Sequence, residues 1–141
     1  MKLFRNDKTI GKKIIKSLKK KIIKAIKHGR IIVIDKDMYR CIGITTILAN
    51  MVREHSNYVL VVSSNMAKQY TMQNYNLNAN QVITVGALAN TKGVGLEAKI
   101  LLLDNSIDYK IYRKYFSSYM GRNIISGIIT EDLSTIEEFI F

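Results

Sequence analysis

A short segment near the start of the chain has the composition of an anion-binding turn. Residues 40–46, Arg-Cys-Ile-Gly-Ile-Thr-Thr, follow the apolar run Ile31–Ile34 and lead into a segment with helical periodicity. Backbone N–H groups at the start of a helix hold an anion, and the helix dipole strengthens that attraction. Gly43 lets the backbone approach a phosphate closely, and a hydroxyl on the first helical turn can bind Mg²⁺. The spacing therefore predicts a phosphate-binding turn formed by Gly43, Ile44, Thr45 and Thr46.

A single carboxylate later in the chain is placed to complete such a site. Asp104 directly follows the apolar run Ile100–Leu103. In open α/β sheets ligands bind at the carboxyl ends of the strands, so Asp104 is expected to support Mg²⁺ together with Thr45. A second interpretation stays open, in which Asp104 only caps a helix that begins near Ile107, because the next two residues are also good caps: Asn105 and Ser106.

The elements that must position these residues follow from the hydrophobic periodicity. Short, wholly apolar runs are typical of strands buried on both faces, and helical stretches separate them. This alternation predicts a single α/β domain over residues 30–141, with about five mainly parallel strands and helices on both faces. The expected strands are Ile31–Ile34, Tyr58–Val62, Val82–Val85, Ile100–Leu103 and Ile124–Ile129, and the expected helices are 9–28, 44–55, 65–74 and 107–120.

Residues 30–130 resemble the ATPase core of P-loop NTPases, a superfamily that includes phage terminase large subunits and helicase-like motors. Residues 40–46 are similar to the Arg-containing Walker A loop of those motors, and Ala98–Asp104 is similar to their Walker B strand. The segment GALANTKGVGLEAKILLLDN resembles the loop that precedes Walker B. The resemblance implies a three-layer P-loop NTPase-like fold that binds ATP and Mg²⁺. It also places the strand 124–129 between or beside those ending at Asp35 and Asp104, with Thr130 as a phosphate sensor; a helix cap is the other interpretation of Thr130.

Two departures from the family pattern weaken the expected chemistry. Ile44 stands where the Walker lysine belongs, and losing a charge-assisted phosphate contact costs about 1.5–3 kcal/mol. Asn105 stands where the catalytic carboxylate belongs, and an amide cannot act as a general base near neutrality. Lys36 or Arg40 could replace the missing lysine, although the alternative for both is a surface charge without a role. We therefore expect weak hydrolysis or none.

The N-terminal 29 residues form a separate, strongly basic segment. Residues 1–30 hold twelve Lys/Arg and one acid, whereas residues 31–141 hold ten of each, and the formal net charge is +11. Apolar residues recur at helical spacing over 9–28, so one face is expected to pack on the domain while the other carries positive charge. That face predicts a nucleic-acid partner, with a solvated lysine face as the alternative and a membrane-surface helix as a less favoured one. Its cations are Lys12, Lys13, Lys16, Lys19, Lys20, Lys24 and Lys27.

Aromatic residues crowd the helix expected after Asp104. They could stack on bases, but four of them share one helical face, which favours core packing. They are Tyr109, Tyr112, Tyr115, Phe116 and Tyr119.

Composition excludes several classes of protein. A single Cys excludes an internal disulfide, and one Cys with two His excludes a conventional zinc site. No apolar run approaches the roughly 18 residues of a membrane span, and the first residues lack the apolar region of a secretory signal. The expected compartment is the cytoplasm, that of the host if the protein is viral.

Three functions remain as hypotheses. The first is a small, phage-type P-loop protein that binds nucleotide phosphate, nucleic acid or both, with weak or no hydrolysis. The second is a pseudo-ATPase that serves as an adaptor or inhibitor of a motor, a nuclease or a host defence complex. The third is nucleic-acid binding through the basic N-terminal helix alone.

Overall fold

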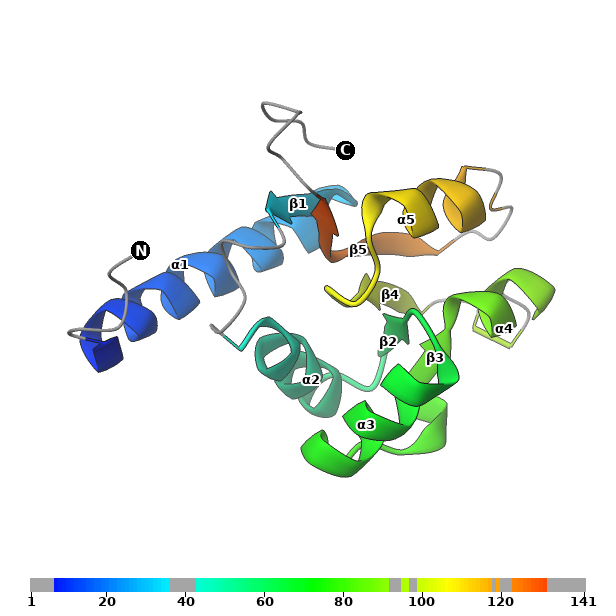
Figure 1. Ribbon diagram of the computed structural model, residues 1–141, viewed down its shortest axis with the longest axis horizontal. Coiled ribbons are helices and arrows are strands. Elements are labelled where there is room, and N and C mark those ends of the chain that lie inside the picture. The colour runs from blue at the N-terminus through cyan, green and yellow to red at the C-terminus, as the bar shows by residue number, and fades with distance from the viewer. Residues whose placement is uncertain are drawn as a thin grey trace.

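The computed structural model describes residues 7–35, 43–91, 95–96, 99–117, 119 and 123–131, with only the backbone described for residues 7–15 and 35 (Figure 1). Within these ranges five parallel strands form one sheet in the order β1-β5-β4-β2-β3. The strands are β1 (Ile31–Asp35), β2 (Tyr58–Val62), β3 (Val82–Thr84), β4 (Ile100–Leu103) and β5 (Ile124–Glu131). The helices are α1 (Asp7–His28), α2 (Ile44–Glu54), α3 (Asn65–Tyr75), a short 3₁₀ helix η1 (Ala79–Gln81), α4 (Val85–Thr91) and α5 (Tyr109–Phe116).

Helices cover both faces of the sheet, which gives the three-layer α/β architecture expected from the sequence. Successive side chains of a strand point to opposite faces, so Leu102 contacts one helical layer while Leu101 and Leu103 contact the other. Helices α1, α2 and α3 pack on the first face, and α4 and α5 pack on the second (Figure 1). All five expected strands are present, and the third ends at Thr84 rather than at Val85.

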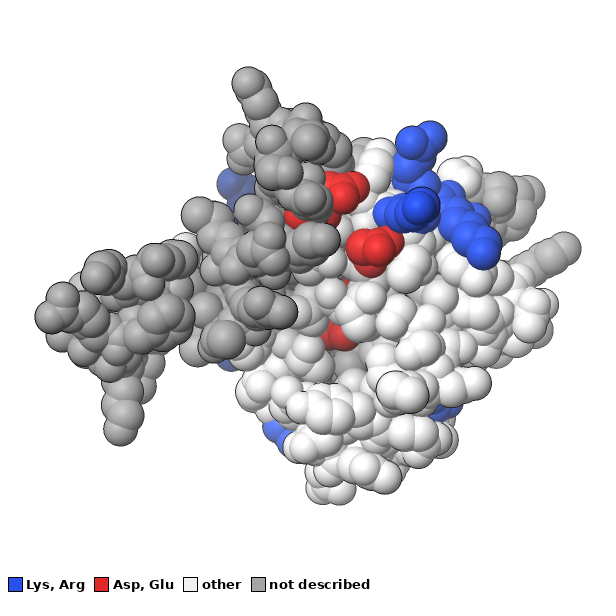
Figure 2. Space-filling model, viewed as in Figure 1, with Lys and Arg blue, Asp and Glu red and all other residues white. Residues whose placement is uncertain are grey.

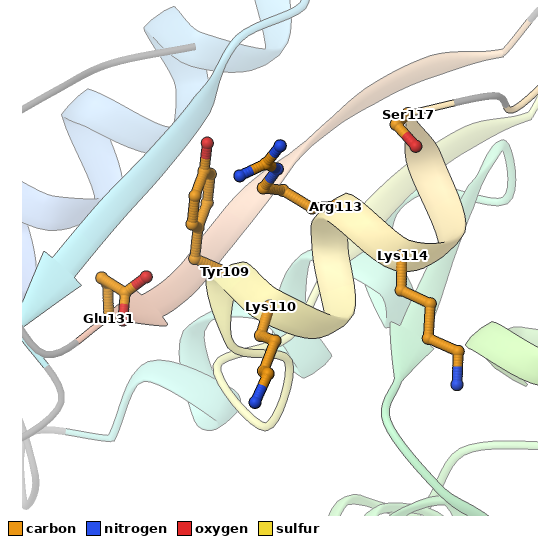
Figure 3. Close-up of a pocket in the computed structure, with 6 residues that line it drawn as sticks. All are labelled: Tyr109, Lys110, Arg113, Lys114, Ser117 and Glu131. Atoms are coloured by element: carbon orange, nitrogen blue, oxygen red, sulfur yellow. The ribbon is translucent and has the colours of Figure 1, made fainter.

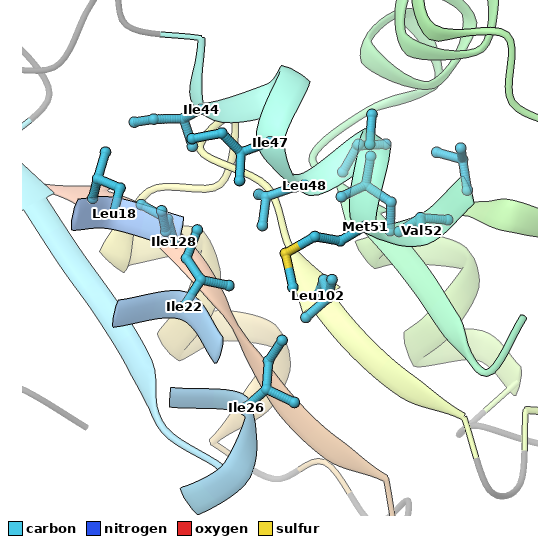
Figure 4. Close-up of a cluster of buried hydrophobic side chains, with 14 of the residues drawn as sticks. Leu18, Ile22, Ile26, Ile44, Ile47, Leu48, Met51, Val52, Leu102 and Ile128 are labelled. Atoms are coloured by element: carbon cyan, nitrogen blue, oxygen red, sulfur yellow. The ribbon is translucent and has the colours of Figure 1, made fainter. Parts of the chain in front are cut away.

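The first face holds the larger core. Leu18, Ile22 and Ile26 recur every four residues along α1 and point into this core (Figure 4). They meet Leu102 and Ile128 from the sheet, together with the apolar face of α2. The basic N-terminal helix is therefore fixed to the sheet by its apolar face, and Gly29, with φ of +63°, turns the chain into β1.

Two helical segments differ from the sequence-based expectation. Residues 86–91, placed in the loop before Walker B, form helix α4 together with Val85, which was expected to end a strand. The Thr84 side chain accepts a hydrogen bond from the Ala87 N–H and starts the helical turn. The helix expected over 107–120 begins only at Tyr109 and ends at Phe116. Ile107 is fully buried and its N–H donates to the Asp104 carbonyl, which keeps that residue in a turn ahead of the helix.

The position of β5 decides where the candidate site lies. This strand lies between β1 and β4, as the resemblance implied, and pairs with both in parallel. Within β5, Gly127 has φ of +112° and lies so close to β4 that a Cβ built on it would be 2.3 Å from the Leu103 carbonyl oxygen. The carboxyl ends of β1, β5 and β4 are thereby held along one edge of the sheet.

Candidate functional site

The expected anion-binding turn is described from Gly43 onward. Gly43 precedes α2 with φ of +73° and ψ of +38°, the left-handed region that glycine adopts without strain. No side chain caps the start of α2, so its first N–H groups have no side-chain acceptor there. Ile44 points into the core and is 2% exposed, so it could offer a ligand only its backbone N–H.

Thr45, on the first turn of α2, meets the residues that follow β4. Its Oγ1 lies 2.9 Å from Asp104 Oδ1 and 2.9 Å from Asn105 Oδ1. These residues are 59 and 60 positions apart in the sequence, so only the parallel sheet brings them together. The structure thus places the two expected Mg²⁺ ligands, Thr45 and Asp104, in contact.

The three oxygens share a single hydroxyl proton. Thr45 can donate to one acceptor at a time, so one of the two neighbouring oxygens lacks that hydrogen bond at any moment. The second acceptor oxygen could gain a partner in three ways: a proton on the Asp104 carboxyl, rotation of the Asn105 amide, or a cation among the oxygens. Oxygen donors of this kind are the ligands that Mg²⁺ takes from proteins.

Burial sets the electrostatics of Asp104. The residue is 3% exposed, and loss of solvation raises the pKa of its carboxyl above the ordinary value of 3.8. Hydrogen bonds oppose that shift: the Ser106 N–H donates to Asp104 Oδ2 at 3.1 Å, and Thr45 donates to the other oxygen. Burial outweighs these hydrogen bonds, so the charged form of Asp104 is disfavoured relative to that of a solvent-exposed carboxyl.

The capping role considered for Asp104 belongs to another residue. The N-cap of α5 is Asp108, whose Oδ1 accepts a hydrogen bond from the Ile111 N–H at 2.7 Å. Asp104 instead closes the turn of residues 104–107 through its contact with the Ser106 N–H. The interpretation of Asp104 as a cap for a helix from Ile107 is therefore wrong.

Thr130 lies at the same edge but does not join the three oxygens. Its Oγ1 is 3.5 Å from the Asn105 carbonyl oxygen, and its N–H donates to the Ile107 carbonyl. An isolated parallel bridge joins it to Asp108. Thr130 thus contacts the turn that carries Asp104, where a sensor residue is expected, and it caps no described helix.

The remaining predicted residues are distributed as follows. Thr46 donates to the Tyr75 hydroxyl on α3 at 3.2 Å rather than to Asp104. Lys36 and Arg40 lie outside the described residues, as do the side chains of Lys12 and Lys13. The other lysines of the predicted nucleic-acid face are exposed on α1: Lys16, Lys19, Lys20, Lys24 and Lys27.

Sequence reasoning missed part of this edge. Ser106 supports Asp104 with its N–H and also accepts a hydrogen bond from the Ser63 N–H at 3.2 Å, which ties the end of β2 to the turn. The sequence indicated Asn105 as a lost base or a helix cap, and the structure instead makes it a direct neighbour of Thr45. A run of Asp, Asn and Ser after a buried strand is the signal that could have indicated such a turn.

Comparison with known proteins adds no relative: no family model matches the chain, and no curated protein or solved structure matches it. Among the described residues, no group of three or more His, Cys, Asp or Glu side chains is placed to hold a metal ion together. None of the helices in the described ranges combines the length and apolarity needed to cross a membrane.

Proposed function

We propose that this protein binds the phosphates of a nucleoside triphosphate, ATP in the first instance, together with Mg²⁺, at the edge formed by α2 and the carboxyl ends of β4 and β5. The observation that carries the proposal is the 2.9 Å contact between Thr45 Oγ1 and Asp104 Oδ1 across 59 residues of sequence. The left-handed Gly43 and the uncapped start of α2 support it, because they leave backbone N–H groups for an anion beside that pair.

The donor set fits Mg²⁺ better than a softer metal. Mg²⁺ is usually held by one or two protein oxygens and completes its shell with water and phosphate oxygens. Thr45 and Asp104 supply such oxygens, and no cluster of His, Cys or further carboxylates accompanies them within the described ranges. When bound, the ion would neutralise phosphate charge. Asp104 would then have a counter-ion for its buried negative charge.

The same residues argue against efficient hydrolysis. Asn105 occupies the place of the expected general base, and its amide oxygen lies against the Thr45 hydroxyl, where it cannot take a proton from water. Ile44 occupies the place of the expected lysine and is buried in the core. We therefore propose binding with weak or no turnover.

Thermal unfolding in the presence of nucleotide tests this function. Binding at ten times the dissociation constant stabilises a fold by about 1.4 kcal/mol, so MgATP or MgGTP is expected to raise the melting temperature by a few degrees. Thr45→Val removes the hydroxyl and is expected to abolish the rise. Thr91→Val is the matched control, because Thr91 lies on α4, away from the candidate site, and its hydroxyl donates to the Leu88 carbonyl of its own helix. An unchanged melting temperature in the wild type at millimolar nucleotide, or a full response in Thr45→Val, would contradict the proposal.

A pseudo-ATPase adaptor is the second candidate, and the burial of Ile44 together with the amide at position 105 favours it. Such an adaptor would bind a motor, a nuclease or a host defence complex with or without nucleotide. The thermal titration separates the two, because the adaptor requires no response to MgATP.

Nucleic-acid binding by α1 is the third candidate. Its apolar face is fixed in the core through Leu18, Ile22 and Ile26, which leaves a row of lysines in solvent. Such a surface binds phosphates without reading sequence, and its affinity falls steeply with salt.

A further inference from the structure

A second cationic surface lies on α5, on the opposite face of the sheet from α1. It is an open groove of about 560 Å³ lined by Tyr109, Lys110, Arg113, Lys114, Ser117 and Glu131, and we refer to it as the α5 groove. In the view of Figure 2, Lys and Arg side chains gather over this part of the molecule. None of these six residues belongs to the candidate nucleotide site.

The cations that line the α5 groove outnumber its acids. Lys110, Arg113 and Lys114 are all exposed to solvent. Glu131 is the one acid among the six lining residues. A polyanion entering the groove would therefore meet a net positive surface.

Aromatic rings lie beside these cations. The Arg113 guanidinium lies 5.8 Å from the centre of the Tyr109 ring, and the Lys114 ammonium lies 5.3 Å from that of Tyr115. Tyr109 stacks on Tyr112 at 6.3 Å, and Tyr112 stacks on Phe116 at 5.5 Å. These rings are half-buried against the sheet, so the helix and its cations are held in place before any ligand arrives.

The directions of the side chains favour a polymer over a single small anion. Lys110 and Lys114 extend to one side of α5, whereas Tyr109 and Arg113 extend to the other (Figure 3). One phosphate cannot contact cations that diverge around a helix, but a chain of phosphates crossing the helix can contact them in succession. The pairing of Tyr109 with Arg113 adds a surface on which an unpaired base can stack.

We propose that the α5 groove binds single-stranded nucleic acid, with phosphates on Lys110, Arg113 and Lys114 and a base against Tyr109. A single strand is favoured over a duplex because base stacking requires an exposed base face. The inference does not depend on the nucleotide site, since it uses other residues and needs no Mg²⁺.

The test is the binding of a fluorescent oligothymidylate of about 12 nucleotides, a length within the range of single-strand binding sites, to the full chain. The triple variant Lys110→Gln, Arg113→Gln, Lys114→Gln is expected to bind about tenfold more weakly or worse. The slope of log affinity against log salt concentration should become shallower by about 2 in this variant, because each of the three lost phosphate contacts contributes about 0.7 to the slope. The comparison variant is Lys16→Gln, Lys19→Gln, Lys20→Gln, which removes the same charge from exposed positions of α1, the competing candidate surface, and is expected to lose less affinity than the α5 variant.

A pair of substitutions at Tyr109 tests the aromatic contribution. Tyr109→Leu is expected to lower affinity roughly fivefold or more, whereas Tyr109→Phe keeps the ring and should bind as the wild type does. Thermal unfolding of each variant verifies that it folds. The proposal is overturned if the α1 variant loses as much affinity as the α5 variant, if a duplex of the same length binds more tightly, or if polyglutamate competes as well as the oligonucleotide.

Discussion

Replacing Gly127 by alanine is the sharpest test of the sheet that builds the candidate site. Gly127 pairs with Leu103 on β4 and with Ile31 on β1, and a Cβ on it would lie 2.3 Å from the Leu103 carbonyl oxygen and 2.4 Å from the Leu103 nitrogen. Ordinary van der Waals contact is 3.4–4 Å, and the atoms in conflict are backbone, so the strands themselves must separate. A φ of +112° adds strain for any residue with a Cβ.

These two effects set the size of the expected change. Forcing extra volume into a packed region costs about 1–3 kcal/mol, and a strained backbone costs a further 1–3 kcal/mol. Gly127→Ala should therefore lower the free energy of unfolding by about 2–6 kcal/mol, a large share of the roughly 5–15 kcal/mol typical of a domain. Urea unfolding followed by circular dichroism measures this change directly.

Gly86→Ala is the matched control for that measurement. Gly86 lies in α4, has no atom within 4 Å of a built Cβ, and is in a helix, where alanine is preferred over glycine by about 0.5–1 kcal/mol. The control should therefore unfold at slightly higher urea than the wild type. If Gly127→Ala were as stable as the wild type, β4 and β5 would not be paired in this register, and the placement of Asp104 beside Thr45 would be refuted with it.

Two further substitutions address the turn between β4 and α5. Asp104→Asn should raise the free energy of unfolding near neutral pH. The raised pKa of Asp104 means that the folded state holds a proton more tightly than the unfolded chain does. The contribution of this carboxyl to stability is therefore complete below pH 3.8 and is lost as the pH rises through the raised pKa. Urea unfolding across pH should show the advantage of the variant shrinking toward pH 3.8, and a constant difference at all pH values would contradict this. Asp108→Ala removes the cap on the Ile111 N–H and should cost about 0.5–2 kcal/mol by the same assay, whereas an unchanged midpoint would mean that Asp108 does not cap α5.

The strands could be predicted from the sequence because strands buried on both faces have continuous apolar runs. Tyr58–Val62 and Ile100–Leu103 coincide with β2 and β4 for this reason. β5 extends past its apolar run because Thr130 and Glu131 pair with Ile34 and Asp35 of β1, and that register is a property of the neighbouring strand. Helix α4 was missed because it starts directly at the end of β3, on a cap supplied by a strand residue, Thr84.

For the candidate site, the sequence predicted which segments meet but not their detailed contacts. The contact of Thr45 with Asp104 followed from placing both at the carboxyl edge of a parallel sheet. That Asn105 also faces Thr45 depends on how residues 104–107 turn, which is set by the hydrogen bonds of Ser106 and Ile107. The sequence did indicate the close approach of β5 to β4 at Gly127, because a glycine inside an apolar strand often marks a close backbone approach.

Asp104 gives a physical reason to look for a ligand at this edge. Its carboxyl is buried, its charge is opposed by desolvation, and Thr45 has one proton for two acceptors. An asparagine at position 104 could accept a hydrogen bond from the Ser106 N–H and donate one to Thr45 Oγ1. The Thr45 hydroxyl would then be free to donate to Asn105 Oδ1. A neutral amide would thus complete the hydrogen bonds of this turn better than the acid does. A cation bound by these oxygens reverses that preference, because only the carboxylate offers it a negative charge in a site with little solvent.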